Sequence, residues 1–270
     1  MLKERILTAL VLIPLVLWCI FGDATGRQFA AFAGAIVLVG AWEWTALMSW
    51  SNKAARAAFV AAVGAGLIAM TVLSLSAIHI ALYAVSAIFW LIAVRGVVFY
   101  PESAAIWAKS AVLVPVGLIL LLPAWAGLTD LHHLSPWWLM YVFGLVWGAD
   151  TGAYFVGRAF GKNKLAPKVS PGKTIEGMVG GLLTTSVLIV AVAIYRDLPL
   201  IRMVAFIGLS LFTVLASVLG DLVESMVKRQ AGVKDSGSIF PGHGGALDRI
   251  DSLTAAAPIF ALGWWLAGGF

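Results

Sequence analysis

Asp248 and Asp251 are spaced three residues apart, immediately before an apolar run that begins at Leu253. If a helix begins here, both carboxylates share one face of its first turn. One carboxylate is enough to cap a helix, with Asp251 or Ser252 as the N-cap residue. A second carboxylate on the same face favours a divalent cation, because hard cations prefer carboxylate oxygens. The spacing therefore predicts a metal site, with helix capping as the alternative.

Asp221 and Glu224 form a second acidic pair with the same spacing, just past a long apolar run. We expect this pair at the C-terminal end of a membrane helix, where carboxylates oppose the helix dipole. A metal ion, or Lys228 and Arg229, would compensate. Asp221 is the stronger metal ligand because it lies nearer the membrane boundary, and an ordinary solvated helix end is the alternative interpretation.

A basic cluster lies between the two acidic pairs and consists of Lys228, Arg229 and Lys234, followed by Asp235. Alone, it is equally typical of a cytoplasmic loop that contacts lipid headgroups. Beside four carboxylates, it favours phosphate binding, with Asp235 paired to Lys234 or joined to the polar network. Arg249, between the two aspartates, is expected to balance their charge or to contact a phosphate.

The run Pro-Gly-His-Gly-Gly at 241–245 excludes regular helix. Glycines allow backbone amides to turn toward an anion, so we expect Gly244 and Gly245 to bind a phosphate. His243 is expected to donate to a phosphate oxygen or to transfer a proton. A histidine that is satisfied within its own turn is the alternative.

Two further acidic residues lie inside apolar runs, where an ionisable group is a functional candidate. Asp150 falls near the inner end of the run 137–157, and a hydrogen bond to a neighbouring helix is its alternative role. Glu43 lies near mid-span between two tryptophans. The sequence offers no partner for Glu43, and we assign it no role.

The loop 158–177 contains Ser170 and a Gly-Lys-Thr triplet centred on Lys173. The triplet is not a nucleotide P-loop, which requires glycine where this chain has Pro167 and a preceding strand. A basic loop that holds a triphosphate in another way remains a plausible interpretation.

Composition identifies the class of protein that must position these groups. Of the 270 residues, 61% are hydrophobic and 11% are charged, and apolar runs recur along the whole chain. Soluble domains carry roughly 25% charged residues, so an all-α, polytopic membrane protein is expected. The net charge of +5 does not indicate nucleic-acid binding, because membrane proteins concentrate basic residues in cytoplasmic loops.

Hydropathy predicts nine membrane helices. The expected spans are 6–21, 28–50, 57–75, 79–94, 110–127, 137–157, 178–195, 203–220 and 253–270. With the N-terminus in the cytoplasm, 15 of the 18 Lys and Arg residues fall inside, and only Arg27, Arg196 and Arg202 fall outside. This asymmetry predicts that the polar loops 158–177 and 221–252 both face the cytoplasm.

The stretch from Ser225 to Asp251 resembles the signature of the phosphatidate cytidylyltransferase (CDP-diacylglycerol synthase) family. The matching positions are Ser225, Lys228-Arg229, Lys234-Asp235, 241–245 and 248–251. The resemblance extends to 150–154 and 170–177, and so covers about the second half of the chain. One position departs from the pattern: Ala246 stands where a larger apolar residue is usual, which concerns packing behind the turn.

The resemblance implies an enzyme that makes CDP-diacylglycerol and pyrophosphate from CTP and phosphatidate. It implies a catalytic membrane region at 137–270, an N-terminal region at 1–136 without an assigned role, a bacterial-type inner membrane with the site on its cytoplasmic face, and a homodimer. The expected metal ligands, for Mg²⁺, are Asp221, Asp248 and Asp251. Expected catalytic residues are Lys228, Arg229, Lys234, Asp235 and His243; expected substrate-binding residues are Asp150, Ser170, Lys173, Ser225, Gly244, Gly245 and Arg249.

Three other functions fit parts of the pattern less well. A phosphotransferase that consumes CDP-diacylglycerol needs an Asp-rich helical motif that the chain lacks. A transporter would thread ionisable residues through the bilayer, with Asp150 and Glu43 along the path, but the charges here gather at one face. A receptor for anionic lipid would not need paired carboxylates.

Overall fold

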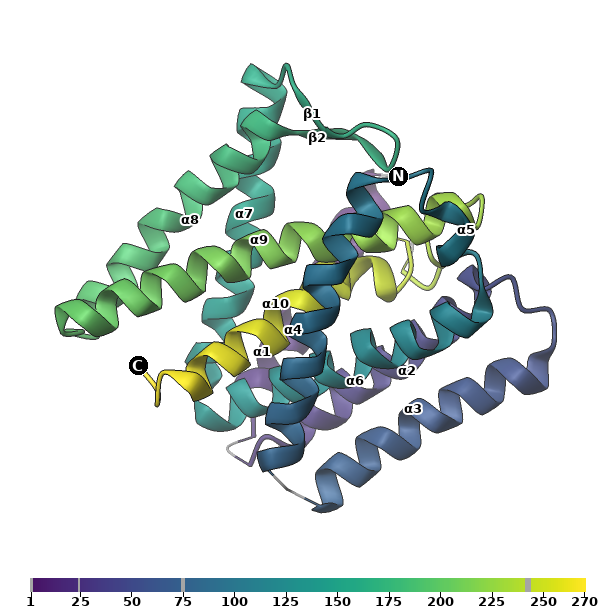
Figure 1. Ribbon diagram of the computed structural model, residues 1–270. Helices are drawn as coiled ribbons and strands as arrows, with labels where there is room; N and C mark the ends of the chain where they lie inside the picture. Colours follow the sequence, from purple (N-terminus) through teal and green to yellow (C-terminus); the bar gives the residue numbers. More distant parts are fainter. Residues whose placement is uncertain (1, 24, 74–75, 241–243) are drawn as a thin grey trace.

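The computed structural model describes the backbone of residues 2–23, 25–73, 76–240 and 244–270, without the side chains of 2–9, 11, 12 and 76 (Figure 1). Ten helices and one hairpin make up these residues. The elements are α1 Leu2–Phe21, α2 Arg27–Leu47, α3 Lys53–Leu73, α4 Ser76–Val98, α5 Ala104–Trp107, α6 Ser110–Leu134, α7 Pro136–Phe160, β1 Lys164–Ala166, β2 Ser170–Thr174, α8 Ile175–Tyr195, α9 Leu200–Gln230 and α10 Leu247–Leu266.

The predicted all-α membrane class is confirmed. Each of the nine expected spans corresponds to one long helix, and α5 is an additional short one. Seven described helices are long and apolar enough to cross a membrane, namely α2, α3, α4, α6, α7, α8 and α9. The number of crossings and the cytoplasmic N-terminus stay predictions.

Both predicted bounds of the loop 221–252 are wrong. Helix α9 continues to Gln230 and α10 begins at Leu247, so the connecting segment is only 231–246. With 31 residues, α9 is about 46 Å long and exceeds a hydrocarbon core of about 30 Å. The apolar run ends at Gly220, whereas the helix continues to Gln230 because its polar residues also favour helix. Asp221 and Glu224 therefore lie within α9 and not at its C-terminus.

The predicted loop 158–177 contains the antiparallel hairpin of β1 and β2. The Gly-Lys-Thr triplet lies within β2, which excludes the phosphate-binding loop geometry of a P-loop. The Thr174 hydroxyl accepts a hydrogen bond from Gly177 N at 3.1 Å and so caps α8. The cap joins the hairpin directly to the membrane helix.

Small residues bring the helices of the C-terminal half into close contact. A Cβ on Gly220 of α9 would lie 2.6 Å from the Asp251 carbonyl oxygen of α10. A Cβ on Gly181 of α8 would lie 2.7 Å from the Ala149 carbonyl oxygen of α7. Such contacts between small residues replace hydrophobic burial as the main packing force between membrane helices. The Gly220 contact holds the acidic turns of α9 and α10 together.

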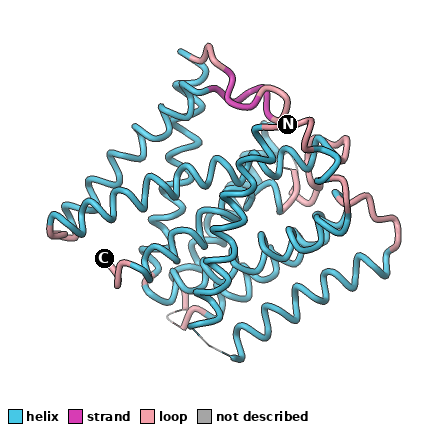
Figure 2. The backbone as a smooth tube through the Cα atoms, viewed as in Figure 1, coloured by secondary structure: helices cyan, strands magenta, loops and turns pink. Residues whose placement is uncertain are grey.

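The polar segments gather at one end of the helical bundle. Figures 1 and 2 show the N-terminus, the hairpin, α5 and residues 231–240 toward the same end, with the C-terminus and the α8–α9 turn at the opposite end. Arg229 Nε donates to the Val169 carbonyl at 3.3 Å and links the end of α9 to the hairpin. This end of the bundle therefore contains both segments that the sequence marks as functional.

Candidate active site

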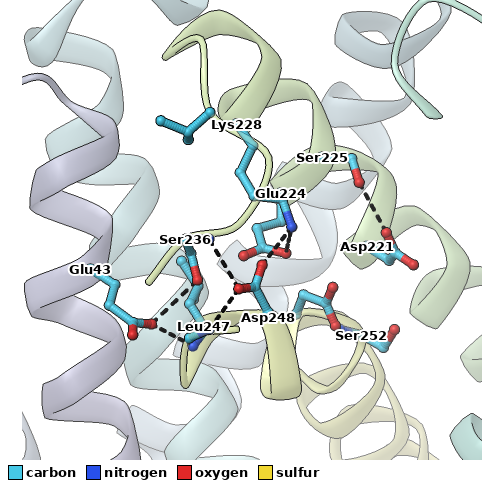
Figure 3. Close-up of polar contacts among 12 residues, drawn as sticks. Glu43, Asp221, Glu224, Ser225, Lys228, Ser236, Leu247, Asp248 and Ser252 are labelled. Carbon is cyan, nitrogen blue, oxygen red and sulfur yellow. Dashed lines mark hydrogen bonds and ion pairs between the residues drawn. The ribbon is translucent and has the colours of Figure 1, made fainter. Parts of the chain in front are cut away.

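Lys228 lies at the centre of the polar cluster, between carboxylates of two helices (Figure 3). Its Nζ donates to Glu224 Oε2 at 2.9 Å, one turn earlier on α9, and to Asp248 Oδ1 at 2.6 Å on α10. All three side chains are nearly inaccessible to solvent. A buried ammonium is stable only when it is paired in this way, so the lysine and both carboxylates form one unit.

Asp248 organises the turn that precedes α10. Its Oδ2 accepts hydrogen bonds from Gly245 N at 2.8 Å and from Ser236 N at 3.0 Å. Gly244 has a φ of +80°, and a Cβ there would also lie 2.6 Å from Asp248 Oδ2. The glycines therefore permit a tight approach of backbone to carboxylate. The Gly245 amide, which the sequence predicts to bind phosphate, donates to Asp248 in the structure.

Glu43 is the residue that sequence reasoning missed. Only 6% exposed, its carboxylate accepts from Leu247 N at 2.8 Å, Ala246 N at 3.1 Å and Ser236 Oγ at 3.3 Å (Figure 3). A Cβ on Gly245 would lie 2.5 Å from both carboxylate oxygens. A carboxylate inside an apolar helix signals a buried partner, but nothing in the sequence indicates where that partner lies.

Glu43 also changes the interpretation of the N-terminus of α10. The N-cap position is Ala246, which has no side-chain cap, so capping by Asp251 or Ser252 is wrong. The first amides of α10 donate instead to a carboxylate from α2, where the helix dipole favours negative charge. Asp251 and Ser252 therefore do not have the capping role that the alternative interpretation gave them.

Asp221 joins the hairpin to α9. Lys173 Nζ on β2 lies 2.6 Å from Asp221 Oδ2, and Ser225 Oγ donates to Asp221 Oδ1 at 3.1 Å. Both lysine and aspartate side chains remain about a quarter exposed. Lys173, Asp221 and Ser225, which the sequence analysis singles out, are thus in contact, and the ion pair between the first two is accessible to solvent.

The cluster has more acidic than basic groups. Its carboxylates are Asp221, Glu224, Asp248 and Asp251, whereas its ammonium groups among the described residues are Lys173 and Lys228. Glu224 Oε1 is buried without a hydrogen-bond partner among the described residues, and Asp251 is a neighbour of Glu224. Two adjacent buried carboxylates, one of them with an unpaired oxygen, suit a divalent cation.

No three His, Cys, Asp or Glu side chains converge into a ready-made metal site within the described ranges. The residues nevertheless fit such an ion: Glu224 has an unpaired oxygen, Asp251 adjoins it, and Asp221 acts on Asp251 electrostatically. Asp248 differs from Glu224 because both of its oxygens already accept hydrogen bonds, and it accepts three in all, whereas Asp221 accepts one from Ser225 and pairs with Lys173. The predicted ligand set Asp221, Asp248 and Asp251 stays a prediction.

Asp150 lines a pocket of about 340 Å³ between α7, α8, α9 and the hairpin. Lys173 and Arg158 line the same pocket, which gives it two basic walls. Lys173, Asp221 and Arg249 are the charged neighbours that act on Asp150. The pocket thus adjoins the Lys173–Asp221 ion pair, and the exposed Arg249 of α10 lies near enough to act on Asp150.

Arg229 points away from the carboxylates. In addition to its bond to Val169, its guanidinium donates to the Val233 carbonyl at 3.4 Å. Both contacts are with backbone oxygens of the hairpin connection and of the segment 231–246. Arg229 therefore braces two polar segments against each other in this structure.

The structure brings the remaining predicted site residues together less closely. Lys234 and Asp235 are exposed in the segment 231–246, and Ser170 is a partly buried residue of β2 paired with Ala166. His243 lies outside the described residues, so its predicted role has no structural test. Their roles stay predictions.

Comparison with known proteins identifies related sequences over the whole chain. The family model described as "Cytidylyltransferase family" matches residues 3–266. A protein of Pseudomonas aeruginosa named phosphatidate cytidylyltransferase is 47% identical over 271 residues, which cover 99% of this chain and 98% of that protein. A protein of the same name from Haemophilus influenzae is 43% identical over 282 residues, covering 97% and 98%.

Proposed function

This chain belongs to the cytidylyltransferase family, and we propose that its buried lysine–carboxylate cluster transfers the cytidylyl group of CTP to phosphatidate. The products are CDP-diacylglycerol and pyrophosphate. One observation carries the assignment of the site: Lys228 is held between Glu224 and Asp248, beside the Lys173–Asp221 pair. Cations fixed next to an accessible polar pocket suit a reaction between two anionic substrates.

The reaction requires one new bond and one broken bond. A phosphate oxygen of phosphatidate attacks the α-phosphorus of CTP and forms the new P–O bond. The bond from that phosphorus to the oxygen bridging to the β-phosphorus breaks, and pyrophosphate leaves with the electron pair. A phosphate monoester is already ionised near pH 7, so the site needs no strong general base. Positioning and charge neutralisation are therefore the main tasks of the protein.

Lys173 and Lys228 supply the positive charge that offsets repulsion between the substrates. Lys173 lies on the hairpin and lines the 340 Å³ pocket, so it is assigned to the triphosphate. The Lys228 ammonium is fixed by two carboxylates and needs little reorganisation when charge develops on the leaving group. Asp248 positions both Lys228 and the turn at Gly245.

The excess of carboxylates is assigned to Mg²⁺. Asp221, Glu224 and Asp251 would hold the ion, because Glu224 Oε1 is unpaired among the described residues and Asp251 adjoins it. A bound divalent ion supplies charge neutralisation for the phosphates of CTP. Asp248 stays outside this set because it already accepts three hydrogen bonds.

The site is assigned to the cytoplasmic face of a bacterial-type inner membrane, where CTP is dissolved and phosphatidate is embedded. The hairpin and the segment 231–246 carry most of the exposed basic residues near the site, in keeping with the preference of such residues for cytoplasmic segments. The homodimer that the resemblance implies remains a prediction.

An assay of the purified protein tests this function. The protein is incubated in phosphatidate-containing micelles with cytidine-labelled CTP and Mg²⁺, and label in the lipid phase is measured together with pyrophosphate release. Label and pyrophosphate are expected to appear in equal amounts. Folded wild-type protein that yields neither product would overturn the proposal. A reaction with diacylglycerol in place of phosphatidate is the control, because it lacks the attacking phosphate.

A further inference from the structure

An apolar cavity of about 610 Å³ adjoins the candidate active site. Its walls come from α1, α2, α6, α7 and α10, with Phe240 contributed by the segment 231–246. Every lining side chain is apolar except Arg249. A nucleotide would find no hydrogen-bond partner along these walls except Arg249, whereas hydrocarbon suits them.

The cavity runs from the polar cluster into the membrane region. On α10 it begins with Arg249, which directly follows Asp248. On α2 its wall extends from Val37 to Phe29, which is eight residues or about 12 Å of helix. This length is close to the half-thickness of a hydrocarbon core of about 30 Å. A long aliphatic chain fits a cavity of this depth, whereas a small apolar molecule would fill only part of it.

The cavity is open along one side. Ile13 of α1 and Trp147 of α7 line it and are 59% and 53% exposed. A chain can therefore enter sideways from the bilayer without crossing the polar end. Trp147 lies one turn before Asp150, so the cavity and the polar pocket are neighbours along α7.

We propose that this cavity binds one acyl chain of phosphatidate, with Arg249 holding the phosphate at its mouth. The inference rests on the proposed function and adds the location of the lipid substrate. Charge complementarity supports this occupant: one guanidinium stands at the polar end of an otherwise apolar cavity, and phosphatidate places one phosphate at the end of its chains. Arg249 is also a charged neighbour of Asp150, in the pocket assigned to the nucleotide.

The proposal predicts that the cavity limits acyl-chain length. Ala33 of α2 is a buried lining residue, and Ala33→Phe would shorten the space available beyond it. Relative to wild type, the ratio of kcat/KM for long-chain over short-chain phosphatidate is expected to fall about tenfold, since some methylenes lose their burial. The KM for CTP should not change. Val72→Phe is the matched control. Val72 lies on α3 outside the cavity and is 74% exposed, so this variant should leave the ratio unchanged.

Photo-crosslinking tests occupancy without relying on catalysis. Phosphatidate with a diazirine near the end of one acyl chain is added to the wild-type protein in vesicles, irradiated, and mapped by peptide mass spectrometry. Label is expected on α2 and α7 within the cavity, and excess unlabelled phosphatidate should reduce it. Label spread evenly over the exposed faces of α3 and α4 would indicate bulk lipid and overturn the proposal. If a second copy of the chain covers the cavity and keeps the label out of it, the proposal is also overturned.

The two tests separate this inference from the proposed function. Wild-type protein without product overturns the function whatever the crosslinking shows. Active protein with an unchanged chain-length ratio in folded Ala33→Phe, or with no competed label in the cavity, overturns the acyl-chain site alone.

Discussion

The carboxylate of Glu43 accepts a hydrogen bond from Leu247 N at 2.8 Å, across 204 positions of sequence. Helix α2 therefore fixes the start of α10, the helix that carries Asp248 and Asp251. The N-terminal region, to which the sequence assigns no role, positions the candidate active site through this contact.

Glu43→Ala is expected to lower the free energy of unfolding by about 3 kcal/mol, because it leaves two backbone donors at the start of α10 and the Ser236 hydroxyl without their acceptor. Glu43→Gln keeps an acceptor oxygen and should recover part of this loss. Thermal unfolding in detergent measures both. Glu102→Ala is the control, since Glu102 is 70% exposed and has only a 3.7 Å ion pair with Lys168. Equal stability of the Glu43→Ala and Glu102→Ala proteins would contradict this role.

Lys228→Met is expected to lower kcat by at least about 100-fold, the usual effect of removing one preorganised charge from an active site. Methionine preserves most of the side-chain volume but leaves Glu224 and Asp248 without their shared cation. Turnover of CTP with phosphatidate measures the effect. Lys53→Met, at the exposed start of α3, should retain wild-type turnover. A Lys228→Met enzyme within a few-fold of wild type would remove this lysine from the mechanism.

Asp251→Asn is expected to raise the Mg²⁺ concentration needed for half-maximal activity, because it removes charge from the assigned ion site. Asp221→Asn should act in the same direction and also release Lys173. Chelation should stop the wild-type reaction, and added Mg²⁺ should restore it. The control is Asp197→Asn in the α8–α9 turn, where φ is +49° and asparagine is well tolerated. Unchanged Mg²⁺ dependence in both site variants would refute the ion assignment.

Gly245→Ala is expected to destabilise the protein by about 1–3 kcal/mol, because its Cβ would lie 2.5 Å from the Glu43 carboxylate oxygens. The Glu43 carboxylate cannot move away without losing its bonds to α10. Gly208→Ala in α9 is the matched control, because nothing lies within 4 Å of a Cβ there. That variant should be neutral or more stable by up to about 1 kcal/mol. Chemical denaturation that ranks the two variants in the opposite order would contradict the predicted crowding.

Hydropathy was sufficient to predict the positions of the nine long helices, because each contains an apolar run of near membrane length. It could not predict where α9 ends, because a helix needs no apolar side chains once it leaves the bilayer. For the same reason the sequence predicted Asp221 and Glu224 at a helix end, whereas both residues lie inside α9. The expected start of the last helix near Asp248 and Asp251 is confirmed, since α10 begins at Leu247.

The sequence was sufficient to predict most residues of the site, but not the contacts that these residues make with one another. The motif residues form two groups of ion pairs: Lys173 pairs with Asp221, and Lys228 pairs with Asp248 and with Glu224. Which lysine pairs with which carboxylate depends on the helix crossing at Gly220, which no local pattern encodes. The partners of Glu43 and the turn of Arg229 toward the hairpin are likewise long-range contacts.

The continuity of α9 determines which parts of the site can move. Asp221, Glu224 and Lys228 belong to one uninterrupted helix whose earlier turns are apolar enough to lie in the bilayer. We therefore expect these three residues to form the fixed side of the site. The opposite side of the site is formed by the hairpin with Lys173 and by residues 231–240, in which Lys234 and Asp235 are exposed. We therefore expect the exposed parts of these two segments, and not α9, to adjust when substrate enters and pyrophosphate leaves.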